Sequence, residues 1–128
     1  METKEKVFQA LKRFGLMPQE EDDGRILFFF QMTLYMYVPD ADDPGYVAIY
    51  TPDIHEVGEG NEVEVMQVVN ECNMKMKASK LMMVGNASVW GAFEMYVADG
   101  EEFDDMIRRG IICLHDTKSM FEREMKGL

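Results

Sequence analysis

Thirteen consecutive residues without a charge, ILFFFQMTLYMYV at Ile26–Val38, constrain the fold of this chain more than any other segment. A membrane-spanning helix needs roughly 18–20 apolar residues, so the segment is too short to cross a bilayer as a helix. Its aromatic and β-branched side chains are typical of β-strands. The segment therefore predicts a β-hairpin, with its turn at Gln31-Met32.

The predicted hairpin has two unlike faces. A turn at Gln31-Met32 sets Phe30 opposite Thr33 and Ile26 opposite Tyr37, and opposed residues in an antiparallel pair share a face. We expect the aliphatic face to belong to the core and the aromatic face, with its hydroxyl tips, to form a surface. The expected core face carries Leu27, Phe29, Leu34, Met36 and Val38, and the expected surface carries Ile26, Phe28, Phe30, Thr33, Tyr35 and Tyr37.

Helix and strand patterns alternate along the rest of the chain. A length of 128 residues predicts one domain spanning residues 1–128. The predicted order α-β-β-β-α-β-β-α gives an α+β fold, a five-stranded antiparallel sheet packed by helices. Its further elements are helices at about Thr3–Phe14, Asn61–Lys77 and from Asp99 onward, and strands at Tyr46–Thr51, Lys80–Val84 and Ser88–Val97, the last two joined by a Gly85-Asn86 turn.

The second predicted helix carries an apolar stripe of Val63, Met66, Val69 and Met76, which we expect to face the core. Two asparagines, Asn70 and Asn73, lie on or beside this stripe. Asparagine is a mediocre helix former that hydrogen-bonds readily to nearby backbone. We therefore expect both to have a structural role, anchoring the helix to strand or loop backbone.

Aromatic side chains with polar tips recur in the later strands. Such residues are enriched at protein interfaces and their hot spots. If they share one side of the sheet, that side would engage a polypeptide or a second copy of the chain. The alternative is that a helix of the same chain covers them. The candidate partner-binding residues are Phe28, Phe30, Tyr35, Tyr37, Tyr50, Trp90 and Tyr96.

The formal net charge of −11 argues against nucleic acid as a partner, because phosphates would be repelled. The N-terminal residues alternate charged and apolar side chains and lack the apolar run of a signal peptide. No segment predicts a membrane span. Cys72 and Cys113 are accordingly expected to be reduced thiols in a cytoplasmic protein.

Metal-binding patterns are incomplete. The segment Asp40–Gly45 begins like an EF-hand calcium loop. However, Pro44 at loop position five has no side-chain ligand, and Thr51 stands at position twelve, where the loop needs a bidentate glutamate. His55 and His115 lie sixty residues apart, outside any zinc spacing. We expect no metal and no cofactor.

Catalytic patterns are also missing. Cys113 and His115 are two residues apart on a predicted helix and point to different sides, so they form no nucleophile–base pair. An enzyme would need a pocket around Glu94, His55 or His115. We therefore expect no catalytic residue.

The segment VMQVVNECNMKMKASK at Val65–Lys80 and the strands LMMVGNASVWGAFEMYV that follow it resemble the YbjN-like family, whose domains look like type III secretion chaperones in fold. Upstream, DDGRILF and DDPGY fit the same pattern, so the resemblance spans about Gly15 to Met125. It implies a small, acidic, often dimeric binding module without a cofactor.

These observations predict a non-catalytic, chaperone-like or adaptor module that binds a polypeptide or itself. A regulatory domain that binds a small ligand between sheet and helices is the alternative.

Overall fold

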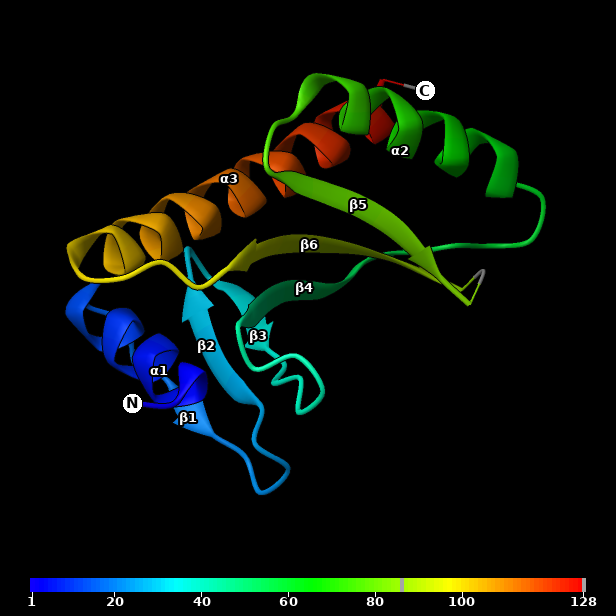
Figure 1. Cartoon of the computed structure of the whole chain (residues 1–128). Coiled ribbons are helices and arrows are strands. Elements are labelled where there is room, and N and C mark those ends of the chain that lie inside the picture. Colours follow the sequence, from blue (N-terminus) through cyan, green and yellow to red (C-terminus); the bar gives the residue numbers. More distant parts are fainter. Residues whose placement is uncertain (86, 128) are drawn as a thin grey trace.

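All three helices lie on one side of an antiparallel sheet in the computed structural model, which describes residues 1–85 and 87–127 (Figure 1). The sheet has the strand order β1-β2-β3-β4-β6-β5. Its strands are β1 (Gln19–Glu20), β2 (Ile26–Phe30), β3 (Thr33–Tyr37), β4 (Tyr46–Glu56), β5 (Ser79–Val84) and β6 (Ser88–Tyr96). The helices are α1 (Thr3–Arg13), α2 (Glu62–Lys75) and α3 (Glu101–Lys126). Helix α3 spans the layer, with α1 beside its first half and α2 beside its end.

The predicted hairpin register is confirmed. Strands β2 and β3 pair with Phe30 opposite Thr33 and Ile26 opposite Tyr37. Gln31 and Met32 both have positive φ angles, 50° and 61°. Two positive φ angles define the type I′ turn, whose twist matches that of the flanking strands.

The assignment of the hairpin's two faces was wrong. Phe28 and Tyr35, expected at the surface, are buried, whereas Phe29, expected in the core, is 65% exposed. The reason is the position of the helices, which cover the face that carries the aromatic set. Tyrosine rings bury readily there because each hydroxyl needs only one partner or an opening at the rim.

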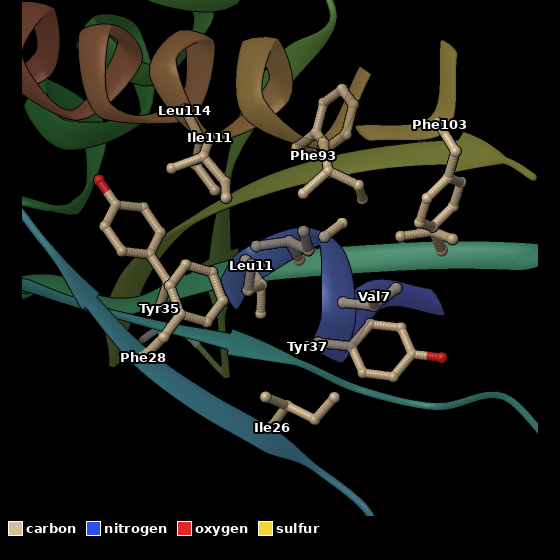
Figure 2. Packing of buried hydrophobic residues seen from close by; sticks show 14 residues of the cluster. Val7, Leu11, Ile26, Phe28, Tyr35, Tyr37, Phe93, Phe103, Ile111 and Leu114 are labelled. Atoms are coloured by element: carbon tan, nitrogen blue, oxygen red, sulfur yellow. The ribbon is translucent and has the colours of Figure 1, made fainter. Parts of the chain in front are cut away.

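The main core lies between α1, α3 and the sheet (Figure 2). Four side chains of α3 at helical spacing enter it: Phe103, Ile107, Ile111 and Leu114. Gly110 lets α3 approach the sheet closely: a Cβ atom there would lie 2.3 Å from the ring of Phe93. The cluster consists of Val7, Ala10, Leu11, Ile26, Phe28, Tyr35, Tyr37, Val47, Ile49, Phe93, Phe103, Ile107, Ile111 and Leu114.

A second, smaller cluster lies under α2, and the stripe predicted for this helix was only partly correct: Val69 packs against the cluster. Helix α2 buries Val65, Val68 and Cys72 against the sheet and α3. Val63 and Met66 are exposed instead, at 67% and 57%. Apolar residues occupy two overlapping helical stripes in this segment, so periodicity did not identify the buried one.

The sheet has six strands in the described residues, one more than predicted. The extra strand is β1, two residues that pair with Ile26 and Leu27. Strand β4 also continues past Pro52 through an irregularity between Thr51 and His55, where Asp53 has a φ of 51°. A bulge of this kind re-aims the side chains that follow it.

Most other element boundaries lie within two residues of their predicted positions. Helix α3 begins at Glu101 after Gly100, so Asp99 is not its first residue. The predicted turn at Gly85-Asn86 includes Asn86, which lies outside the described residues.

Candidate functional site: the open face of the sheet

The side of the sheet opposite the helices is the candidate functional site, and we call it the open face. Cross-strand pairs place its residues together: Met36 lies opposite Tyr50, and Tyr46 lies opposite Tyr96. Their chain neighbours Tyr37, Ile49 and Val47 point into the helix-covered core. The open face carries Leu27, Phe29, Leu34, Met36, Tyr46, Ala48, Tyr50, Lys80, Met82, Trp90, Ala92, Glu94 and Tyr96.

The seven aromatic residues proposed from the sequence do not share one side. Phe28, Tyr35 and Tyr37 are buried in the main core, and Phe30 is partly buried against it. For these four, the alternative that helices of the same chain cover them is correct. Tyr50, Trp90 and Tyr96 lie on the open face.

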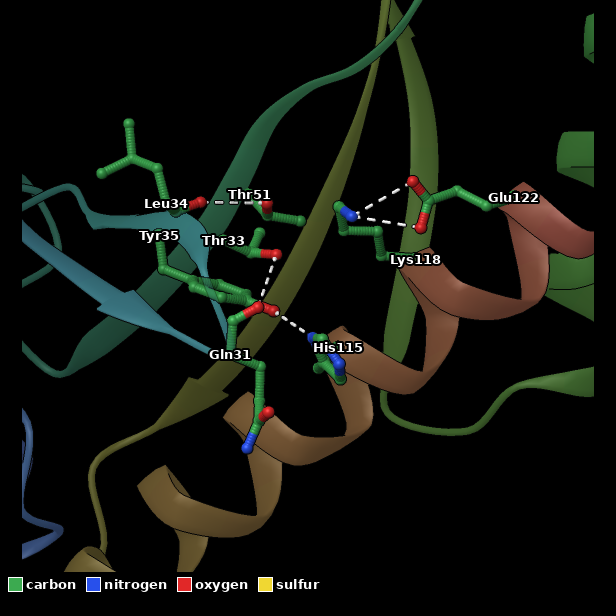
Figure 3. A network of polar contacts seen from close by, with 8 residues as sticks. All are labelled: Gln31, Thr33, Leu34, Tyr35, Thr51, His115, Lys118 and Glu122. Carbon is green, nitrogen blue, oxygen red and sulfur yellow. Dashed lines mark hydrogen bonds and ion pairs between the residues drawn. The ribbon is translucent and has the colours of Figure 1, made fainter.

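Tyr35 shows how a buried aromatic residue satisfies its polar tip. Its hydroxyl lies 3.1 Å from Nδ1 of His115 on α3, as Figure 3 shows. Burial raises the pKa of the Tyr35 hydroxyl, with Asp116 and Glu122 adding to the rise. The ring of Phe30 meets His115 edge-on at 5.5 Å. His115 is therefore a packing partner of the hairpin.

Trp90 and Tyr50 form the first aromatic group of the open face. Their ring centroids are 6.1 Å apart in an edge-on arrangement. The indole Nε1–H of Trp90 donates to Oδ1 of Asp53 at 3.3 Å, and the Ser88 hydroxyl donates to the same oxygen at 2.8 Å. The irregularity in β4 places Asp53 beside these groups.

Tyr46 and Tyr96 form the second aromatic group. Their centroids are 5.9 Å apart, and the Tyr96 hydroxyl donates to Oδ2 of Asp43 at 3.2 Å. The charge of Asp43 raises the pKa of Tyr96. Tyr96 is 67% exposed, so its ring is available to a partner.

An ion pair lies between the two aromatic groups. Nζ of Lys80 is 2.7 Å from Oε1 of Glu94. The hydrogen bond from Lys80 holds the pKa of Glu94 below its usual range, and the Tyr46 hydroxyl acts in the same direction. The carboxylate of Glu94 is therefore charged at neutral pH.

The apolar end of the open face was missed by sequence reasoning, which assigned it to the core. It comprises Leu27, Phe29 and Leu34 on the hairpin, with Met36 beside them. Met36 is buried even so, and the guanidinium Nη1 of Arg25 lies 3.3 Å from its sulfur. Asp53 and Asp43 were also missed; the indole N–H of Trp90, which needs an acceptor, was the one available signal.

The residues considered for chemistry do not converge on a site. Among residues 1–85 and 87–127 no group of three or more His, Cys, Asp or Glu side chains could hold a metal ion. Asp40 instead caps its own turn, accepting the backbone N–H groups of Asp42 and Asp43 at 3.0 and 3.2 Å. His55 packs edge-on against Phe121 at 5.7 Å, under α2 and α3.

The two cysteines are free thiols, Cys72 buried and Cys113 half-buried. Burial raises the pKa of the Cys72 thiol, which disfavours the reactive thiolate. The backbone carbonyl of Cys113 accepts hydrogen bonds from Thr117 and Ser79, at 2.9 and 3.3 Å. None of the helices in the described residues is long and apolar enough to cross a membrane.

The two asparagines of α2 differ in what they contact. The side-chain amide of Asn73 donates to the carbonyl of Leu81 at 3.1 Å and accepts from its N–H at 2.8 Å. Asn70 is exposed and reaches only the sulfur of Met74, at 3.7 Å. Asn73 therefore ties α2 to the sheet edge, while the Asn70 side chain forms no hydrogen bond with strand backbone among the described residues.

Solved structures share this fold. YbjN from E. coli, described as a candidate transcription regulator, has a TM-score of 0.68 and 13% identity, with 97% of this chain and 93% of YbjN covered. The Yersinia pestis type III secretion chaperone SycH, solved in complex with a stable fragment of YscM2, has a TM-score of 0.63 and 8% identity, with 92% and 98% covered. An uncharacterized protein from Methanothermobacter thermautotrophicus has a TM-score of 0.58 and 8% identity, with 94% and 97% covered.

No protein-family model matches the chain, and no curated protein matches it in sequence. At these identities the structural likeness shows the fold. The chain therefore has the fold of YbjN and of the secretion chaperone SycH, which confirms at the level of fold the resemblance predicted from the sequence. Neither of these two descriptions names an enzyme.

Proposed function

We propose that this protein is a non-catalytic interaction module that binds a polypeptide through the open face of its sheet. The observation that carries the proposal is the asymmetry of the sheet. All three helices pack on one side of the sheet. The other side carries Phe29 and Tyr96, which are exposed, and Trp90 and Tyr50, which are half-buried. Exposed apolar and aromatic side chains that gather on one face of a protein are typical of a binding site.

The chemistry of this surface supports protein as the partner. Tryptophan and tyrosine dominate interface hot spots because a large ring buries much area at little cost in conformational entropy. Phe29, Leu27 and Leu34 extend the surface with purely apolar side chains. SycH, of the same fold, was solved with a fragment of another protein bound. That complex supports polypeptide binding as a use of this architecture, not a particular partner for this chain.

A second copy of the chain is the other partner that the open face could take, which would make the protein a homodimer. The small-ligand alternative has less support. The space between sheet and helices, where such a ligand would bind, is filled by the main core cluster. One wide surface hollow lies between the start of α1 and the loop before β4, lined by Thr3, Gly24, Tyr37, Pro39 and Pro44 among others.

The test compares alanine variants on the two sides of the molecule. Tagged protein is crosslinked in its native cytosol, captured and analysed by mass spectrometry, while light scattering of the purified protein reports self-association. Trp90→Ala with Tyr50→Ala should abolish the specific crosslinks and leave far-UV circular dichroism unchanged. Ile112→Ala, which removes an exposed apolar side chain from α3, is the control.

The outcomes separate the alternatives. A specific polypeptide lost with the open-face variant and kept with Ile112→Ala supports the proposal. Crosslinks confined to a second copy assign the open face to a homodimer. A crosslinked partner retained by the open-face variant contradicts the proposal, and a monomer without partners leads to a thermal-shift screen for small ligands.

A further inference from the structure

Two carboxylates of the open face have aromatic donors but no basic partner. Asp53 accepts hydrogen bonds from Trp90 and Ser88 through Oδ1, and Asp43 accepts one from Tyr96 through Oδ2. Within residues 1–85 and 87–127 neither carboxylate forms an ion pair with lysine or arginine. The second oxygen of each carboxylate accepts no side-chain hydrogen bond in the same residues.

The basic side chains on this face are already engaged. Arg25, just before β2, pairs with Asp23 at 2.8 Å, and Lys80 pairs with Glu94 at 2.7 Å. Each pair is neutral, so Asp43 and Asp53 leave the open face with an excess of negative charge. A basic partner would offset this excess, and an acidic one would be repelled.

The arrangement around each carboxylate suits a guanidinium group in particular. A guanidinium is planar, donates hydrogen bonds in a fork, and stacks on aromatic rings. Beside Asp53 it would find the indole of Trp90 and the ring of Tyr50, which are 6.1 Å apart. Beside Asp43 it would find Tyr96 and Tyr46, 5.9 Å apart. Charge pairing and cation–π attraction would then act on the same group.

We propose that the polypeptide bound by the open face carries arginine side chains, one held by Asp53 with Trp90 and one by Asp43 with Tyr96. This rests on the proposed function, because it names the chemistry of the partner for the same surface. Trp90 and Tyr96 stand six residues apart on β6. At the rise of a strand that is roughly 20 Å, so an extended segment would present its two arginines about six residues apart.

The experiment uses a synthetic peptide of defined composition. An acetylated and amidated nine-residue peptide carries arginine at positions 2 and 8, with threonine and valine alternating elsewhere. Its control replaces both arginines with citrulline, which has the same shape without the charge. Binding is followed by chemical shifts in two-dimensional NMR and by fluorescence of Trp90, the only tryptophan in the chain.

We expect the arginine peptide to bind about tenfold tighter than the citrulline peptide. Asp53→Asn and Asp43→Asn keep an oxygen for their aromatic donors and remove the charge. Each should weaken the arginine peptide severalfold and leave the citrulline peptide unchanged. Asp116→Asn, which removes an exposed charge from α3, should change neither. Raised ionic strength should reduce the difference in affinity between the two peptides, because salt screens the charge attraction.

Each other result overturns a defined part of the inference. Equal binding of both peptides, with shifts at Trp90, removes the arginine proposal and leaves polypeptide binding by the open face standing. If both aspartate variants still bind the arginine peptide more tightly than the citrulline peptide, Asp53 and Asp43 are not the groups that hold the arginines. Absence of binding by either peptide contradicts the arginine proposal, whereas the crosslinking experiment tests the proposed function independently.

Discussion

Phe28 and Phe29 are neighbours on β2, yet Phe28 is 1% exposed and Phe29 is 65% exposed. The same contrast runs across the whole sheet. The helix-covered side is a close-packed core, and the open side presents aromatic and apolar side chains among charged groups. The contrast shows that hydrophobicity alone did not decide which side became the core; the position of the helices did. It also implies that substitutions on the two sides should separate stability from binding.

The largest expected effect tests this contrast directly. Phe28→Ala should lower the free energy of unfolding by about 3–5 kcal/mol, because it removes a buried ring from close-packed surroundings. Phe29→Ala should change it by less than about 0.5 kcal/mol. Chemical denaturation of the two purified variants measures both values. Equal losses would show that the open face is covered and that Phe29 is packed as closely as Phe28.

The close approach of α3 to the sheet gives the next largest effect. Gly110→Ala brings a Cβ atom against the ring of Phe93, and we expect a loss of about 1–3 kcal/mol despite alanine's better helix propensity. Phe93→Leu in the same chain should recover part of this loss, because it removes the ring that is struck. A double-mutant cycle by denaturation measures the coupling. Additive losses would mean that the helix moves aside instead.

Strand β5 forms one edge of the sheet, and the side chain of Asn73 caps part of its backbone. Strand β5 is the last strand, so the outward N–H and C=O of Leu81 have no neighbouring strand. The Asn73 amide occupies both groups, as a neighbouring strand would. Unprotected edges of this kind invite pairing with another chain.

Asn73→Ala should therefore lower the free energy of unfolding by about 1–2 kcal/mol and promote association through β5. Asn70→Ala, one turn away and exposed, is the matched control and should be near neutral. Denaturation and light scattering measure the two effects. A monomeric Asn73→Ala variant would show that the edge is protected by other means.

The sequence predicted the hairpin register because turn position and strand pairing are local. Gln31 and Met32 form the turn, and the pairing follows from it. The faces were inverted because the sorting used the polarity of the side-chain tips. Tyr35 and Tyr37 both bury their rings, and the Tyr35 hydroxyl is satisfied by His115 on a distant helix. A local sequence pattern cannot show that such a distant partner exists.

The candidate site could be predicted only in part, for the same reason. Tyr50, Trp90 and Tyr96 were identified from residue type, but their neighbour Asp53 comes from a bulge beyond Pro52, where the strand was expected to end. In α2, apolar residues on both sides left the buried stripe undetermined, and only packing selected Val65 and Val68 over Val63. Long-range packing decided what local chemistry could not.

The smallest expected effect concerns charge on the open face. The pKa of Glu94 is lowered by Lys80, so the ion pair stabilises the fold above the carboxyl's unfolded pKa and is lost as pH falls through its folded pKa. Because Lys80 is 54% and Glu94 32% exposed, we expect Lys80→Met to cost below about 1 kcal/mol at neutral pH. Below the folded pKa of Glu94 the difference from the natural chain should vanish.

Two measurements check this expectation. NMR titration of the Glu94 carboxyl should show its pKa rising in Lys80→Met, and denaturation at neutral and acidic pH should show the stability difference closing. Lys77→Met removes an exposed lysine without an ion pair among the described residues, and it should leave the titration of Glu94 unchanged. A large loss of stability at neutral pH in Lys80→Met would instead show that the ion pair is tightly packed. The open face would then resemble the helix-covered side in its energetics, and its aromatic groups would serve stability before binding.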